Sequence, residues 1–177
     1  HISSPMLHAM KRAVSSQQVR DILWRLRDEV PGIAVRTTLI VGFPGETEAD
    51  FEELRDFVAE YRFERMGAFT YSQEESTPAF DLPDQVDHDV ALARQAELME
   101  IQRGIMAGHN KARVGEVLPV LIDGRAPEGG GFVGRTQADA PEVDGVVRID
   151  GDLHSGDLIP VKITGSDDYD LTGVVAD

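Results

Sequence analysis

TLIVGFPGET, residues 38–47, joins an apolar run to a tight turn and then to the start of a helix. The β-branched residues of the run favour a strand, and Gly42 and Gly45 can adopt the positive φ that a tight turn requires. Thr47 and Asp50 follow at capping-box spacing, with Asp in the place usually taken by Glu. The stretch predicts a strand, a turn and a helix, and parallel α/β folds bind ligands at this end of a strand.

The flanking sequence extends this unit in both directions. Residues 16–30 carry apolar side chains at helical spacing after a cap at Ser15 or Ser16, and Pro31-Gly32 ends that helix. Residues 33–41 are almost continuously apolar, which predicts a strand covered on both faces. Residues 66–71 predict a second strand after the helix that starts at Thr47. The order predicts a parallel sheet with right-handed crossovers.

A polar loop and a long helix follow the second predicted strand. The loop covers residues 72–86 and contains proline. The helix covers residues 88–112, and Asp87 is its expected cap. Its apolar periodicity places Leu92, Ala96 and Met99 on the inward face, and either Arg103 or Ile105 continues this face.

The character of the sequence changes at Gly115. Short β-rich runs separated by Gly and Asp turns predict five strands at residues 116–122, 131–136, 145–150, 158–164 and 170–175. Five short strands in so few residues predict a small OB-like barrel. We therefore expect two domains, residues 1–112 and residues 113–177.

Composition limits the partners and the chemistry of the chain. The net charge is −15, and from residue 113 onward five basic and thirteen acidic side chains leave a balance of −8. Such a surface repels nucleic acid and favours a basic protein, although solubility alone is an adequate explanation of the charge. The predicted barrel also has few aromatic side chains for stacking on bases, namely Phe132 and Tyr169.

Several classes of site are absent from the sequence. The chain has no cysteine, so it supplies no thiolate for zinc or iron–sulfur clusters. Its five histidines show no metal-ligand spacing, and we expect most of them to be solvated. No run approaches the length of a membrane span, and no signal peptide is visible. The turn at residues 42–45 matches neither a phosphate loop nor the dinucleotide fingerprint. The first residues read as the interior of a longer polypeptide.

Four segments together resemble the radical S-adenosylmethionine methylthiotransferase family. They are His1-Ile2-Ser3 with Met10-Lys11-Arg12, residues 36–47, residues 69–74 with 77–79, and residues 134–145 with 168–173. The first three occur across the family. The fourth is similar to the branch that modifies an aspartate of the small-subunit ribosomal protein S-twelve (RimO type). The resemblance covers essentially the whole chain.

The resemblance implies a fold and an activity. Residues 1–112 would be the C-terminal part of a radical SAM partial (β/α) TIM-like barrel, and residues 113–177 a TRAM domain. Family enzymes use S-adenosylmethionine and two [4Fe–4S] clusters to insert a methylthio group. Because this chain lacks cysteine, we expect it to hold neither cluster and to be inactive alone. The parent enzyme would be cytoplasmic, with a basic protein of the small ribosomal subunit as its partner and without direct nucleic acid binding.

The resemblance also implies two sets of site residues. The expected walls of the S-adenosylmethionine pocket are Arg36, Thr38, Ile40, Gly42, Phe43, Pro44, Gly45, Glu46, Tyr71 and Ser72. Strand alternation points Arg36, Thr38 and Ile40 to one side, and a structural ion pair is an equal alternative for Arg36. The family motif has its acid one position before Glu46, so the role of Glu46 stays open. The expected substrate-docking residues are Asp139, Glu142, Asp144, Asp168, Tyr169 and Asp170.

Two other functions compete with this interpretation. The first is a methylthiotransferase acting on tRNA adenosine, for which a basic TRAM domain is expected. The second is a non-catalytic binding module that retains part of a barrel.

Overall fold

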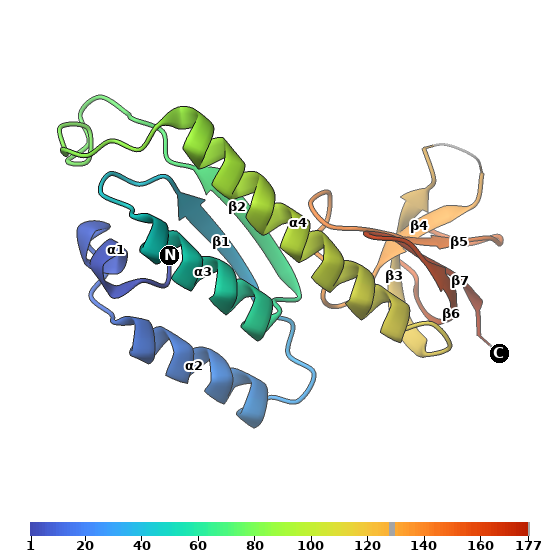
Figure 1. The fold of residues 1–177 in the computed structure, drawn as a ribbon. Coiled ribbons are helices and arrows are strands. Elements are labelled where there is room, and N and C mark those ends of the chain that lie inside the picture. Colours follow the sequence, from blue (N-terminus) through green and yellow to red (C-terminus); the bar gives the residue numbers. More distant parts are fainter. Residues whose placement is uncertain (128–129, 177) are drawn as a thin grey trace. The chain divides into compact units, whose positions relative to one another are not determined.

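The computed structural model describes residues 1–127 and 130–176. The chain forms two compact units, unit 1 at His1–Gln102 and unit 2 at Arg103–Asp177. The elements, labelled in Figure 1, are α1 (Ser4–Ala9), α2 (Ser16–Glu29), β1 (Arg36–Val41), α3 (Glu48–Tyr61), β2 (Arg65–Thr70), α4 (His88–Ala112), β3 (Val117–Arg125), β4 (Phe132–Arg135), β5 (Val147–Ile149), β6 (Leu158–Ser166) and β7 (Leu171–Val175). Unit 2 thus begins inside α4, and the domain boundary expected near residue 113 stays a prediction.

Two parallel strands form the sheet of unit 1. β1 pairs with β2 from Arg36 opposite Arg65 to Val41 opposite Thr70, which confirms the parallel arrangement. Leu39 and Val41 are buried against the helices, whereas Ile40 is 41% exposed. The expectation of a strand covered on both faces is therefore wrong for the described residues. Side chains alternate along β1 as the strand period requires.

Helix α3 covers the buried face of this sheet. The capping box is confirmed, because the Thr47 side chain accepts from the Asp50 N–H and Asp50 accepts from the Thr47 N–H. Phe51, Leu54 and Tyr61 lie on its buried side, at the spacing of one helix face. The Tyr61 hydroxyl donates to a main-chain carbonyl of α2 at 3.0 Å. Aromatic contacts and this hydrogen bond hold α2 on α3, although no residue of α2 is fully buried.

Helix α4 has the predicted bounds but a different inward face. Ala91, Leu98 and Ile105 are buried, whereas Leu92 is 42% exposed and Ala96 is exposed. The predicted face is therefore wrong at Leu92 and Ala96. The apolar periodicity did not predict this face correctly because two polar side chains, Arg94 and Gln102, are buried on it. A prediction from apolar residues alone leaves such side chains out.

The turn after β1 depends on its glycines. Gly42 and Gly45 have φ of 72° and 83°, which confirms the positive φ expected of both. A Cβ on Gly42 would lie 2.5 Å from the Ala91 Cβ of α4. Glycine is needed at this position both for its backbone conformation and for the close approach of the helix.

Unit 2 contains a closed barrel with strand order β3-β4-β5-β7-β6. β5 and β7 are parallel, and the other neighbours are antiparallel. The five predicted strands are confirmed within a few residues at each end. The barrel core consists of the inward side chains Val120, Ile122, Phe132, Val147, Ile149, Val161, Ile163 and Leu171. This arrangement confirms a small OB-like barrel.

Candidate functional site

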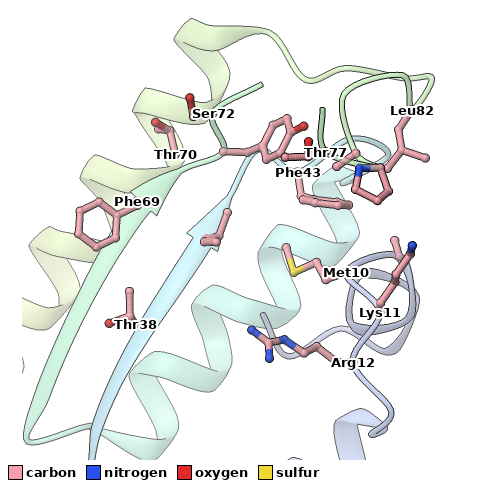
Figure 2. A pocket seen from close by; sticks show the side chains of 15 residues that line it. Met10, Lys11, Arg12, Thr38, Phe43, Phe69, Thr70, Ser72, Thr77 and Leu82 are labelled. Carbon is pink, nitrogen blue, oxygen red and sulfur yellow. The ribbon is translucent and has the colours of Figure 1, made fainter. Parts of the chain in front are cut away.

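An open cavity of about 620 Å³ lies over the exposed face of the β1–β2 sheet in unit 1. Figure 2 shows its walls: Thr38 and Phe69 stand on the two strands, and Met10, Lys11 and Arg12 belong to the turn after α1. Thr77, Pro78, Ala79 and Leu82 of the following loop complete the lining. The cavity therefore lies at the carboxyl end of parallel strands, where α/β folds bind ligands.

Half of the predicted cofactor residues line this cavity. They are Thr38, Ile40, Phe43, Tyr71 and Ser72. Arg36 is exposed at the start of β1 and has an interaction partner, and it does not line the cavity. Gly42, Pro44, Gly45 and Glu46 are also outside the lining; Gly42, Pro44 and Glu46 are buried and Gly45 is half-buried in the turn that contains Phe43. Binding of a cofactor by the ten residues stays a prediction.

Two aromatic residues form the end of the cavity beside this turn. The rings of Phe43 and Tyr71 meet edge to face with centroids 5.1 Å apart. The Tyr71 N–H donates to the Val41 carbonyl at 2.8 Å, which continues the β1–β2 ladder by one residue. The Tyr71 hydroxyl is buried and has no hydrogen-bond partner among the described residues. A buried polar atom of this kind is available to a ligand.

The buried Glu46 side chain stabilises the turn through hydrogen bonds. Its carboxylate accepts from the Gly42 N–H at 2.9 Å and from Arg94 at 2.7 Å. The buried His1 imidazole lies 3.4 Å from the same carboxylate, and its Nδ1 accepts from the Ile2 N–H. His1 is thus an exception to the expectation of solvated histidines. The geometry supports a structural role for Glu46, which the motif comparison left open.

A second carboxylate ties the N-terminal segment to α3. Asp50 accepts hydrogen bonds from the hydroxyls of Ser3 and Thr47 and from the Thr47 N–H. Burial alone would raise the pKa of Asp50, but these hydrogen bonds outweigh it and leave the pKa below its ordinary value. The ionised form of Asp50 therefore holds the segment that leads to the cavity.

The predicted docking residues of unit 2 mostly hold loops. Asp139 accepts from the Thr136 hydroxyl at 2.6 Å, and Asp144 accepts from the Ala140 N–H at 2.6 Å. Glu142, between them, is exposed. Carboxylates that accept from nearby backbone groups stabilise turns. Binding of a partner by these residues stays a prediction.

A second acidic loop presents Tyr169. The Tyr169 and Asp170 N–H groups donate to Asp167, and they hold the pKa of that carboxyl below its ordinary value. Asp170 accepts from Arg148 at 2.8 Å, and Asp168 pairs with Arg103 at 3.1 Å. Tyr169 is 48% exposed at the tip of the loop.

Sequence reasoning missed some of the groups at this site. Arg94 and His1 reach Glu46 from distant parts of the chain, and no local pattern reports such contacts. Lys11 and Arg12 were noted only as part of a motif, yet both line the cavity. Within the residues that the structure describes, no group of three His, Asp or Glu side chains is arranged to hold a metal ion. No described helix has both the length and the apolar character needed to cross a bilayer.

Comparison with known proteins assigns the barrel and then the chain. The TRAM domain family matches residues 114–176, so the barrel of unit 2 belongs to a TRAM domain. The ribosomal protein uS12 methylthiotransferase RimO of Lachnoclostridium phytofermentans is 46% identical over 175 residues, which cover 98% of this chain and 40% of that protein. The RimO proteins of Myxococcus xanthus and of Anaeromyxobacter are 47% and 48% identical, over 100% and 99% of this chain and 38% of each relative.

These matches show that the chain belongs to the family of the ribosomal protein uS12 methylthiotransferases RimO. It corresponds to the C-terminal part of those enzymes and spans about two fifths of their length.

Proposed function

We propose that this chain is part of an enzyme that methylthiolates the β-carbon of an aspartate in a protein of the small ribosomal subunit. In this proposal residues 1–112 are the last part of a radical SAM barrel and residues 113–177 are the TRAM domain. The observation that carries the proposal is the identity of 46–48% with RimO proteins along nearly the whole chain. Because the substrate is ribosomal, we infer that the parent enzyme is cytoplasmic.

The cavity of unit 1 suits the binding of S-adenosylmethionine. Its volume of about 620 Å³ falls within the range of small-molecule sites, roughly 300–1,000 Å³. Phe43 and Tyr71 offer apolar ring surface for a purine, and the unpartnered Tyr71 hydroxyl is available to one of its polar atoms. The hydroxyls of Thr38 and Ser72 extend this polar lining.

Each part of the chain then has a distinct task. The β1–β2 face binds and orients the cofactor, and the Glu46–Arg94 pair holds the turn that presents Phe43. When bound, S-adenosylmethionine and the two [4Fe–4S] clusters supply the radical chemistry. The chain contains no cysteine, so in this proposal the cluster ligands come from other parts of the enzyme, and the chain alone is inactive.

The TRAM domain serves the protein substrate. Its balance of five basic and thirteen acidic side chains favours a basic ribosomal protein over nucleic acid. In the two acidic loops, carboxylates bound to the backbone make a rigid frame around Glu142 and Tyr169. These exposed side chains, with Asp139, Asp144, Asp168 and Asp170 around them, are the proposed docking surface.

A chimera tests the activity. This chain replaces the matching C-terminal part of the Myxococcus xanthus RimO protein, and the reconstituted enzyme is incubated with uS12, S-adenosylmethionine, a one-electron reductant and sulfide as the sulfur source. We expect mass spectrometry to find a methylthio group on one aspartate. An unmodified uS12, in parallel with a modified one from the intact relative, would contradict the proposal.

A binding experiment separates the competing functions. The chain is titrated with uS12 and with tRNA at low and high salt. We expect uS12 to bind at low salt and to bind more weakly as salt screens the attraction. Tight tRNA binding would favour the tRNA-modifying alternative. Binding of uS12 without any modification by the chimera would favour a non-catalytic module.

A further inference from the structure

The charge of the cavity differs from that of the protein. The chain has 32 acidic and 17 basic side chains. Of the 15 residues that line the cavity, all within the described part of the chain, Lys11 and Arg12 are the charged ones. The rest of the lining is apolar or carries hydroxyl groups. The cavity therefore offers two positive charges above an apolar floor, which favours an anionic group on its ligand.

Neither cation is engaged elsewhere in the described structure. Lys11 and Arg12 are exposed, and neither side chain has an ion pair or a hydrogen bond within residues 1–127 and 130–176. Other arginines of unit 1 pair with acids, such as Arg27 with Glu64 at 2.9 Å. The side chains of Lys11 and Arg12 are thus available to bind an anionic group of a ligand, although the chain contains more carboxylates than cations.

The backbone holds both residues at the mouth of the cavity. The Lys11 N–H donates to the His8 carbonyl at 2.9 Å and the Arg12 N–H to the Leu7 carbonyl at 2.8 Å. These two bonds form a Schellman motif at the end of α1. Lys11 has a φ of 56°, in the left-handed region where glycine is usual. A lysine at a position that suits glycine indicates that its side chain has a use there.

We propose that Lys11 and Arg12 form a carboxylate-binding subsite of the cavity. The proposal rests on the proposed function, which brings two carboxylates to this cavity: the amino-acid carboxylate of S-adenosylmethionine and the side chain of the substrate aspartate. A guanidinium group binds a carboxylate through two parallel hydrogen bonds, and an ammonium adds a point charge. Within the described part of the chain, the cavity lining has no acidic side chain that would compete with the ligand for these two cations.

Two matched pairs of ligands test the subsite. The whole chain is titrated by NMR with S-adenosylmethionine and its decarboxylated analogue, and with capped Gly-Asp-Gly and Gly-Asn-Gly peptides. The amide signals of Thr38 and Tyr71 report on the cavity. We expect the acid-bearing member of at least one pair to bind about tenfold more tightly. The pair that shows this preference identifies the source of the carboxylate.

Three variants assign the preference to the two cations. K11G keeps the left-handed backbone and removes the ammonium, and R12Q removes the guanidinium. We expect both variants to lose most of the preference. K162Q, which removes an exposed charge from β6, should keep it. Retention of the preference in both K11G and R12Q would overturn the subsite.

The outcomes for the subsite and for the proposed function are distinct. Equal binding within both ligand pairs would overturn the subsite and leave an S-adenosylmethionine pocket intact. A preference for the aspartyl peptide without any binding of S-adenosylmethionine would support the subsite and contradict that pocket. Absence of binding by all four ligands would contradict both.

Discussion

The Glu46 carboxylate and the Arg94 guanidinium form an ion pair inside unit 1, with Arg94 Nη1 2.7 Å from Glu46 Oε1. The Glu46 side chain is fully buried and that of Arg94 is 8% exposed. The same carboxylate accepts from the Gly42 N–H, so the pair connects α4 to the turn after β1. Arg94 also bonds to Glu48 at 2.9 Å, at the start of α3. The contacts of Arg94 with Glu46 and Glu48 therefore connect α4 to α3 and to the turn after β1.

Breaking this pair from one side should destabilise the protein strongly. R94M leaves the Glu46 carboxylate buried without its partner, which typically costs about 3–5 kcal/mol. The double variant E46Q/R94M removes both charges and should recover part of that loss. Urea unfolding measures the free energies. E29Q breaks the exposed Arg25–Glu29 pair and should cost less than about 0.5 kcal/mol. An equally small loss of stability for R94M would refute the stabilising role of the Glu46–Arg94 pair.

Asp50 should make stability depend on pH in the acid range. Its pKa is lowered in the folded state, so its contribution is present above the unfolded value of about 3.9 and is lost as pH falls through the folded value. We expect D50N to be less stable than the wild type by about 1 kcal/mol at pH 7. The difference should shrink below about pH 4.

Unfolding measured from pH 7 to pH 3 tests this dependence. E75Q changes an exposed loop carboxylate and serves as the control. A gap between D50N and the wild type that stays constant across this range would show that ionised Asp50 does not stabilise the fold.

Position 11 should prefer glycine to alanine. Lys11 has a φ of 56° at the end of α1. A Cβ is unfavourable in this conformation and glycine avoids it. We expect K11G to be more stable than K11A by about 1 kcal/mol, although both lack the ammonium. Thermal and urea unfolding of the two variants give the comparison. If K11A is the more stable of the two, the left-handed turn does not exist as described.

Two glycines of unit 2 should respond in opposite directions to alanine. Gly104 lies in α4 with no heavy atom within 4 Å of an added Cβ, so G104A should stabilise the helix by roughly 0.5–1 kcal/mol. A Cβ on Gly173 would lie 2.4 Å from Val161 Cγ1 in the barrel, so G173A should destabilise by about 1–3 kcal/mol. Thermal melts distinguish the two, and a stabilising G173A would contradict the barrel packing.

Local patterns were enough to predict the elements around the turn. The Thr47–Asp50 capping box and the positive φ of Gly42 and Gly45 depend on residues a few positions apart. The alternation that places Thr38 and Ile40 on one side of β1 follows from the backbone period alone. The five strands of the barrel were likewise visible as short β-rich runs between turns.

The inward face of α4 could not be predicted in this way. Arg94 and Gln102 are buried there because each finds a distant partner, Glu46 for Arg94 and the Phe63 carbonyl for Gln102. A hydrophobic pattern treats such residues as solvent-facing. Leu92 and Ala96, which the pattern placed on the inward face, are exposed.

The order of residues along the chain thus determined the strand, the turn, the capped helix and the barrel strands, because hydrogen bonding and side-chain period act over short separations. The tertiary structure decided the cavity and its supports. Lys11 and Arg12 reach the same cavity as Tyr71, and His1 and Arg94 reach the same carboxylate, only after folding. Such contacts depend on how elements pack, and a buried charge is stabilised only by the partner that packing supplies.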